Sequence, residues 1–293
     1  MYELVHLKGS SYYIESPAKI GLVKLTDDTV CLIDSGNDKN AARKVMQLLD
    51  ANGWRLSAIY NTHSHADHVG GNKYLHSQTG CRIYAQGVEC AFARHHMIET
   101  AFLWGGFPVK ELLHKFLMAQ DSPAEYLTPE VLPEGWSIID LPGHFFSMVG
   151  FRTPDNVVYL ADCLPSAKTL AKYQITFLYD VGAYLSTLEA VKTLKADVFV
   201  PSHAPVSEDI SELVQINIDK VNEIADIILE ICRTPMNFDA ILQRVFTRLN
   251  LTMTFEQYVL VGSTLKSYLS WLKDNGRVKA YFADNLLLWE AEA

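Results

Sequence analysis

The sequence lacks the patterns by which cysteine stabilises small folds or binds zinc. Its five cysteines are scattered and odd in number, and no two of them form a Cys-x-x-Cys pair. Such a set argues against a disulfide framework and against a cysteine-based zinc site. At 293 residues, the chain is long enough to be stabilised by a hydrophobic core, in one large domain or in a medium domain plus a small one.

Long apolar runs are missing as well. No stretch of the sequence reaches 18 uninterrupted apolar residues, so we expect no membrane-spanning segment and no membrane partner. The first fifteen residues, MYELVHLKGSSYYIE, lack the basic start and apolar run of a signal peptide. We therefore expect a cytoplasmic protein.

Basic residues are too few to dominate the charge, and the formal net charge is −9. Proteins bind nucleic acid largely by neutralising phosphates with Lys and Arg. The acidic balance therefore disfavours a nucleic-acid partner, although it does not exclude a local basic groove.

Apolar runs and helical apolar spacing alternate along the first two thirds of the chain. Strands are expected at 11–15, 20–25, 29–34, 57–61 and 197–201, and in the segments WSIIDLPG, MVGFRT and NVVYLAD between residues 136 and 162, with a hairpin turn at Pro154-Asp155-Asn156. Helices are expected at 40–52, closed by Gly53, and at 185–194. Strands alternating with helices predict an α/β fold with its polar residues in loops at strand ends.

Two segments depart from this alternation. Residues 88–132 are rich in aromatics and helix formers, and we interpret them as a helical insertion. Such an insertion could act as a lid over a functional site of the α/β domain. After residue 206, the pattern predicts helices at 208–231, 238–249 and 255–273 and a hairpin at 277–289. We therefore expect a catalytic domain at 1–206 and a helical, winged-helix-like module at 207–293.

The segment Thr62-His-Ser-His-Ala-Asp-His68 is the strongest chemical signal in the sequence. It places four metal-capable side chains, His63, His65, Asp67 and His68, within six residues. These four cannot share one face of a helix or strand, so a loop must fold them towards a common centre. A polar surface loop is the alternative interpretation.

Three further metal-capable residues each follow an apolar strand. His144 comes after Trp136–Leu141, Asp162 ends YLAD, and His203 follows Val200-Pro201-Ser202. Any one of them alone would more often be structural. Three such residues in the same chain as the histidine-rich loop indicate a common site.

With these motifs the sequence resembles the metallo-β-lactamase superfamily, especially its glyoxalase-II-like branch, the hydroxyacylglutathione hydrolases. The pattern T-H-x-H-x-D-H-x-G-G is matched without gaps, and G-H, A-D and P-x-H elements follow in order over about residues 11–206. The resemblance implies an αββα sandwich of two mixed sheets. It also implies seven metal ligands: His63, His65 and His144 for a first metal, Asp67, His68 and His203 for a second, and Asp162 bridging both.

The departures from other branches are informative. Class B β-lactamases typically have Cys where Asp162 stands and no histidine at the position of His68. Flavodiiron proteins have Glu at the position of His65. Acyl-homoserine lactonases carry a tyrosine three residues after the bridging Asp, where this chain has Pro165. These differences disfavour antibiotic hydrolysis, oxygen reduction and a typical lactonase site.

A two-metal site of this kind suits hydrolysis. Two divalent ions can share one hydroxide and lower the pKa of bound water to roughly 7. The imidazole and carboxylate donors favour zinc, with iron or manganese as alternatives. We expect Asp67 to be catalytic by taking a proton from the attacking water, and the substrate to be a small-molecule thioester, ester or lactone.

Three other functions stay open. An endoribonuclease-type nuclease of the same superfamily would explain a winged-helix-like tail, but residues 206–293 hold eight Lys/Arg against thirteen Asp/Glu. A mononuclear iron persulfide dioxygenase shares the histidine loop, and a binding module with an inactive site is the last alternative. The tail could instead close one wall of the cleft or form a homodimer.

Residues beside the motifs carry secondary predictions. Asp34, at a strand end, either orients a ligand histidine or caps a helix. Gly70 and Gly71 are expected to let the loop turn tightly after His68 and to start a helix. Cys163, beside Asp162, is expected to be a packing residue rather than a nucleophile.

Overall fold

The computed structural model describes residues 2–292. The chain forms two compact units, and each is described by itself. Within the described residues, unit 1 consists of residues 2–142, 146–164 and 194–210, and unit 2 of residues 143–145, 165–193 and 211–292. Among residues 2–292, no helix has the length and apolar character needed to cross a membrane.

The first sheet of unit 1 has seven strands in the order of the chain. They are β1 (Glu3–Lys8), β2 (Ser11–Glu15), β3 (Ile20–Lys24), β4 (Thr29–Ile33), β5 (Arg55–Asn61), β6 (Arg82–Ala85) and β7 (Glu125–Tyr126). The first four are antiparallel neighbours, and β4 to β7 run parallel. The sheet is therefore mixed, and β1 is a strand that the sequence pattern did not predict.

The second sheet of unit 1 has the strand order β11-β10-β9-β8. Its strands are β8 (Ser137–Asp140), β9 (Val149–Arg152), β10 (Val157–Ala161) and β11 (Val198–Pro201). β9 is antiparallel to both of its neighbours, whereas β10 and β11 are parallel. The turn between β9 and β10 contains Asn156 with φ 58°, so the predicted hairpin turn at 154–156 is confirmed.

Unit 1 also contains short helices between its strands. They are α1 (Lys39–Asn52), α2 (Ala66–Val69), α3 (Asn72–Thr79), α4 (Glu89–Arg94) and α5 (Met97–Trp104), with 3₁₀ turns at Lys110–Leu112 and Pro129–Val131. The side chain of Asp38 caps α1, and Gly53 ends it in the left-handed conformation, as predicted. The segment 88–132 is helical only at α4, α5 and the two 3₁₀ turns, because β7 and extended chain make up much of the rest.

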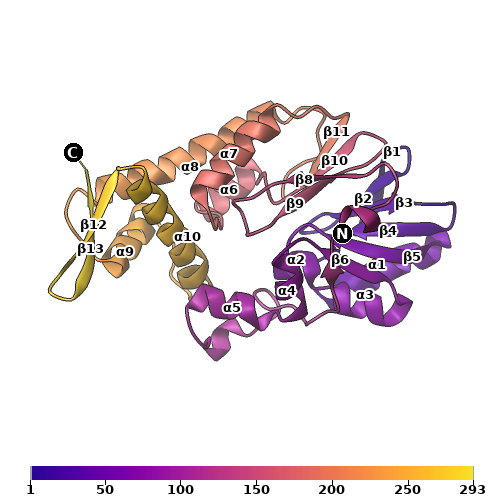
Figure 1. Ribbon diagram of the computed structural model, residues 1–293, viewed down its shortest axis with the longest axis horizontal. Coiled ribbons are helices and arrows are strands. Elements are labelled where there is room, and N and C mark those ends of the chain that lie inside the picture. The colour runs from indigo at the N-terminus through magenta and orange to yellow at the C-terminus, as the bar shows by residue number, and fades with distance from the viewer. Residues whose placement is uncertain (1, 293) are drawn as a thin grey trace. The chain divides into compact units, whose positions relative to one another are not determined.

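The helices and sheets of unit 1 form layers (Figure 1), and clusters of buried hydrophobic side chains pack between them. In one core, Val45 and Leu49 of α1 and Leu75 of α3 pack with residues of the first sheet such as Ile20 and Ile59. In the other, residues of the two sheets pack face to face, among them Ile33, Tyr60, Phe151, Tyr159 and Val200. The two mixed sheets with helices confirm the predicted fold class.

Unit 2 contains helices and one hairpin. Its elements are α6 (Ala167–Tyr173), α7 (Val181–Lys192), α8 (Ser211–Ile231), α9 (Phe238–Arg248), α10 (Phe255–Asp274), β12 (Val278–Ala283) and β13 (Leu286–Ala291). Asn237 caps α9 and Thr254 caps α10, while Asp284 and Asn285 form the hairpin turn with positive φ. Within residues 211–292, three helices and a hairpin thus follow one another, as the tail pattern predicts; Figure 1 shows their arrangement within unit 2. Because unit 2 also includes 165–193, the boundary at 206 stays a prediction.

Candidate metal centre

Six of the seven predicted ligands lie in unit 1, at the ends of its strands. His63 and His65 follow β5 in a three-residue segment that we call the His-Ser-His loop (His63–His65), and Asp67 and His68 lie in α2. Asp162 comes directly after β10 and His203 follows β11. The carboxyl ends of these three strands therefore present the donors, as the sequence pattern predicts.

The six side chains form two groups that share Asp162. In the first, ligand atoms of His63, His65 and Asp162 lie within 4.8 Å of one another, and the same holds for Asp67, His68, Asp162 and His203 in the second. In the second group, Asp162 Oδ1 lies 3.0 Å from His68 Nε2, and Asp162 Oδ2 lies 3.2 Å from His203 Nε2. Asp162 is thus a member of both groups, and its bridging role stays a prediction.

Each histidine ring of the second group is fixed through the nitrogen that faces away from Asp162. His68 Nδ1 lies 2.8 Å from Asp34 Oδ2, and His203 Nδ1 lies 3.1 Å from the carbonyl oxygen of Pro17. In the first group, His63 Nδ1 lies 3.0 Å from Thr62 Oγ1. Partners of this kind hold metal-ligating imidazoles in one tautomer and one orientation.

The ring of His65 is turned the opposite way from the ring of His63. Its Nδ1 lies 3.1 Å from His63 Nε2, so Nδ1 is the atom that faces the centre. Its Nε2 lies on the opposite side of the ring, 3.9 Å from Glu99 Oε1. The two histidines of the loop thus offer different ring nitrogens to a common point.

His144 belongs to the segment Gly143–Phe145, which groups with unit 2. Within that unit its Nδ1 lies 3.0 Å from the carbonyl oxygen of Phe177, which leaves Nε2 as the other ring donor. Its role as a ligand beside His63 and His65 stays a prediction.

In the second group, the aspartates and the histidines shift one another's pKa. Burial alone would lower the pKa of His203, but the carboxylates of Asp162 and Asp67 outweigh it and raise the pKa to about 10. Burial would also lower the pKa of His68, but the charges of Asp162 and Asp67 outweigh it and raise this pKa well above its ordinary value. Burial would raise the pKa of both aspartates, but the two histidines lower the net values. The site therefore compensates concentrated negative charge with positive charge.

The residues fit a pair of divalent metal ions. The buried Nε2 of His68 makes no hydrogen bond within residues 2–292, although Asp162 Oδ1 lies 3.0 Å away. A buried polar atom without a hydrogen bond is costly, and a metal ion would satisfy it. The donors are imidazole nitrogens and carboxylate oxygens, which suit zinc, iron and manganese.

Close backbone packing explains the glycines after His68. A Cβ on Gly70 would lie 2.4 Å from the carbonyl group of Asn37, and one on Gly71 would lie 2.3 Å from the carbonyl oxygen of Ser35. Both glycines have negative φ. The lack of a side chain is what lets the backbone pass this close at both positions, and α3 begins directly after Gly71, as predicted.

Asp34 contacts the predicted ligand His68 and does not cap helix α1. Besides His68, its carboxylate accepts hydrogen bonds from the amide and the hydroxyl of Thr62, both at 2.8 Å. The N-cap of α1 is Asp38 instead. Of the two roles that the sequence left open for Asp34, the cap of α1 is excluded, and the orientation of a ligand histidine stays a prediction that the contact with His68 favours.

Sequence reasoning missed three buried polar residues behind the His-Ser-His loop. They are Glu89, His96 and Glu99, which are 0%, 0% and 3% exposed. Burial raises the pKa of Glu89 to about 7, and burial together with the charge of Glu89 raises that of Glu99 well above its ordinary value. The only signal in the sequence is an acidic residue inside the apolar runs of 89–104, which is too weak to interpret alone.

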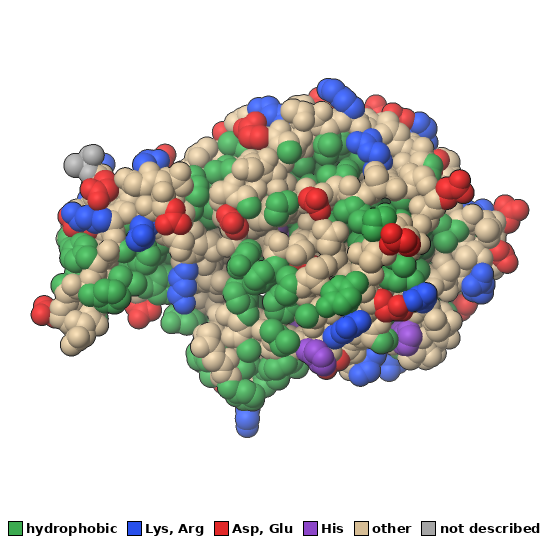
Figure 2. All heavy atoms as spheres, viewed as in Figure 1, with side chains coloured by type: hydrophobic (Ala, Val, Ile, Leu, Met, Phe, Trp, Pro, Cys, Tyr) green, Lys and Arg blue, Asp and Glu red, His purple; other side chains and the backbone are tan. Residues whose placement is uncertain are grey.

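Other candidate surfaces lie away from the predicted ligands. Figure 2 shows hydrophobic side chains gathered over α5; Ile98, Phe102 and Phe107 are exposed there, and Phe107 is 83% exposed.

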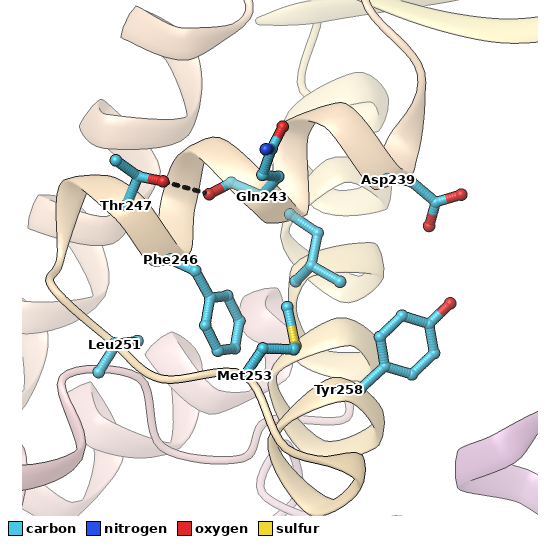
Figure 3. A pocket seen from close by; sticks show the side chains of 8 residues that line it. Asp239, Gln243, Phe246, Thr247, Leu251, Met253 and Tyr258 are labelled. Carbon is cyan, nitrogen blue, oxygen red and sulfur yellow. Dashed lines mark hydrogen bonds between the residues drawn. The ribbon is translucent and has the colours of Figure 1, made fainter.

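In unit 2, a cavity of about 560 Å³ lies between α9 and the start of α10 (Figure 3). It is lined by Asp239, Leu242, Gln243, Phe246, Thr247, Leu251, Met253 and Tyr258. This cavity has no histidine or cysteine and contains none of the predicted ligands.

Solved structures with this architecture support the fold. A beta-lactamase domain protein from Burkholderia ambifaria superposes with a TM-score of 0.75 at 16% identity, covering 99% of this chain and 94% of that one. A metallo-beta-lactamase family protein from Thermus thermophilus gives a TM-score of 0.72 at 16% identity, covering 100% and 98%. At this identity the likeness concerns the fold alone.

Curated relatives match shorter stretches of the chain. The hydroxyacylglutathione hydrolase of Methylobacillus flagellatus is 38% identical over 127 residues, 43% of this chain and 41% of that protein. The hydroxyacylglutathione hydrolase of Methylococcus capsulatus is 52% identical over 46 residues, 16% of this chain and 18% of that protein. The chain thus matches less than half the length of these relatives.

The family itself is matched over a long stretch. The model of the Metallo-beta-lactamase superfamily covers residues 13–203, which include all seven predicted ligands. The covered stretch is well over half of the chain and includes strands β3 to β11 and the loops that carry the predicted donors. The protein belongs to the metallo-beta-lactamase superfamily.

Proposed function

We propose that the protein is a two-metal hydrolase that acts on a small-molecule thioester, ester or lactone. The observation that carries this proposal is the sharing of Asp162 by two groups of ligand atoms. A carboxylate that belongs to both groups would hold a pair of divalent ions together, as two-metal hydrolysis requires. The curated relatives named hydroxyacylglutathione hydrolase favour a thioester among these substrates.

The chemistry divides between the metals and the residues of this chain. When bound, two divalent ions polarise a carbonyl oxygen and bring the pKa of water to roughly 7. Asp162 would hold both ions, and His68 and His203 would complete the second site with Asp67. The side chain of Asp67 is 40% exposed, which leaves its carboxylate accessible to take a proton from the attacking water.

His144 is proposed as the third histidine of the first site. Pro142 and Phe146, on either side of its segment, both belong to unit 1. The chain therefore tethers His144 to unit 1 within two residues on each side. With His63 and His65 it would give three imidazoles and the shared carboxylate, a four-ligand set that suits zinc, with iron or manganese as alternatives.

The nuclease alternative is disfavoured by charge. In a winged-helix-like module, helix α10 would be the recognition helix that contacts nucleic acid. Its only basic residues are Lys266 and Lys273. Lys266 lies over the ring of Phe238 at 5.1 Å, and Lys273 lies 3.9 Å from Asp274. Neither arrangement makes a surface that attracts phosphates. The cavity of unit 2 offers only one carboxylate, that of Asp239, and no basic residue.

One set of measurements tests the proposal. Protein purified without chelator should contain two metal ions per chain by elemental analysis, and it should hydrolyse at least one substrate in a panel of thioesters, lactones and RNA. Thioester or lactone turnover supports the proposal. One iron per chain with oxygen uptake on a persulfide would replace it by the dioxygenase, and turnover of RNA alone would replace it by the nuclease.

A further inference from the structure

Ser64, the residue between His63 and His65, is held on all of its polar groups by residues outside the ligand set. Its amide donates to Glu89 Oε2 at 3.0 Å, and its hydroxyl donates to the same oxygen at 2.7 Å. Its carbonyl oxygen lies 2.8 Å from His96 Nε2. A loop residue held at its amide, hydroxyl and carbonyl has little freedom to rotate.

Glu89 also contacts a second loop of the same unit. Its other carboxylate oxygen, Oε1, accepts a hydrogen bond from the amide of Ser147 at 2.8 Å. Ser147 follows His144 by three residues. One buried carboxylate therefore connects the His-Ser-His loop to the chain just after the third predicted histidine of the first site.

We infer that Glu89 and His96 are positioning residues of the first metal site, which they shape by fixing Ser64 between two ligands. This inference rests on the proposed function, because it assumes that His63 and His65 bind metal. Neither residue touches the centre itself. Each acts on the backbone that sets the separation and direction of the two imidazoles.

The physical reason is preorganisation. A metal site needs its donors held within about 0.5 Å of their working positions, and supporting hydrogen bonds supply that constraint. The helical segment of α4 and α5 inserts these supports behind the loop, and both are fully buried. Water cannot replace them without a new cavity, so their loss should loosen the loop rather than be compensated by solvent.

Glu99 reinforces this arrangement from a third direction. Its Oε2 lies 3.4 Å from the Ser64 hydroxyl oxygen, and its Oε1 lies 3.9 Å from His65 Nε2. The second distance is too long for a hydrogen bond. We therefore assign the positioning role to Glu89 and His96, which make the shorter contacts.

The first test uses two matched pairs of variants. Glu89→Gln places an amide N–H against an N–H donor of Ser64 or Ser147, and Glu111→Gln makes the same change at an exposed glutamate of the same segment. His96→Ala removes the donor to Ser64, and His95→Ala changes the exposed neighbouring histidine. His96→Gln, which keeps an N–H donor, is the rescue variant.

Zinc affinity is the readout that separates positioning from general stability. The full-length protein is titrated with Zn²⁺ against a chromophoric chelator, and His63→Ala and His203→Ala identify which binding step belongs to which site. Loss of supporting contacts typically costs 10–100-fold in metal affinity. We expect a loss of that size confined to the first-site step in Glu89→Gln and His96→Ala, partial recovery in His96→Gln, and no change in the two controls. The absorption spectrum of the Co²⁺-loaded protein should change in the same variants.

The outcomes are distinguishable from those of the proposed function. First-site affinity within twofold of the unchanged protein in both variants would overturn the inference, and so would equal loss at both sites. If Glu89→Gln does not fold, Ser64→Ala, which removes only the hydroxyl that donates to Glu89, replaces it under the same criteria. A protein that binds two metals with these affinity changes but hydrolyses no acyl substrate would refute the proposed function and leave the inference standing.

Discussion

Asp34 and His68 form a buried contact in which Oδ2 of the aspartate lies 2.8 Å from Nδ1 of the histidine. The same carboxylate accepts two hydrogen bonds from Thr62, the residue before the His-Ser-His loop. Asp34 itself has a φ of 64°, a conformation that non-glycine residues adopt only when their surroundings enforce it. One residue outside the ligand set thus fixes a ring of the second site and the start of the loop.

The contact predicts a specific effect of Asp34→Asn. The amide group retains one acceptor oxygen and turns an N–H donor towards either Thr62 or His68, so at least one hydrogen bond is lost. We expect metal affinity to fall about 10–100-fold, the usual cost of losing a carboxylate behind a ligating histidine. Chelator competition measures it, with the exposed Asp50→Asn as control. Unchanged affinity would show that the Asp34 contact is dispensable for the metal site.

Asp162 and Cys163 are neighbours in sequence with opposite expected importance. Asp162→Ala removes the shared ligand, so we expect loss of activity and a reduced metal content by elemental analysis. Cys163 is fully buried, and burial next to Asp162 raises the pKa of its thiol to about 12. A thiol of this kind is a poor nucleophile at neutral pH.

Cys163→Ser should therefore leave most of the activity and the metal content unchanged, and the native protein should resist iodoacetamide at neutral pH. If Cys163→Ser were inactive while still holding its metals, the assignment of the chemistry to the metal centre would be wrong.

The sequence marks the predicted donors more clearly than the residues that support them. The predicted donors lie in a dense local motif and at the ends of apolar strands, and these positions indicated a common site. Glu89 and His96 contact Ser64 from 25 and 32 residues away. Nothing in local spacing marks such a pair, because the contact is set by how the helical segment packs behind the loop.

The same contrast holds for the fold. Features set by their own residues were predicted, whereas a strand that depends on a neighbouring strand was not. Strand β2, the end of α1 at Gly53 and the turn at Asn156 are local features, and the sequence predicted each of them. Strand β1 was missed because its residues are partly exposed and lack a buried apolar run. It forms by pairing with β2 at the edge of the first sheet, a contact that depends on the neighbouring strand.

Asp155 gives a prediction about stability that does not involve metal. Its Oδ2 accepts hydrogen bonds from the Ser10 amide and from the hydroxyls of Ser10 and Ser11, at 2.7–2.8 Å. Burial alone would raise the pKa of Asp155, but these hydrogen bonds outweigh it and lower the pKa below its ordinary value of 3.8. A lowered folded-state pKa contributes stability above the unfolded value that is lost as the pH falls through the folded value.

Asp155→Asn should therefore reduce the free energy of unfolding at pH 7 by about 1 kcal/mol. This loss is at the low end for hydrogen bonds to a charged group, because the Asp155 side chain is only partly buried. The difference from the unchanged protein should shrink as the pH falls below the ordinary value of 3.8. Denaturant titration of metal-free protein at several pH values measures it, with the exposed Asp27→Asn as control. A difference that is constant across this range would mean that the charge of Asp155 does not contribute.

Salt dependence separates the two leading enzyme classes. A nuclease must attract a polyanion, and its affinity then falls steeply with salt because counterions are released. This chain has a formal net charge of −9, so its field should repel RNA at long range. A neutral thioester or lactone would experience little of that field.

We therefore expect kcat/KM on a neutral acyl substrate to change less than about twofold between about 50 and 200 mM salt. We also expect no tight binding of single-stranded RNA at physiological salt. A metal pair is itself a local positive charge that can hold one phosphate group, so a single phosphodiester is a necessary comparison substrate. Cleavage of RNA with a steep salt slope, together with inactivity on every acyl substrate, would place the nuclease ahead of the acyl hydrolase. Cleavage of the small phosphodiester alone, without that slope, would indicate a hydrolase that uses the metal charge but no extended basic surface.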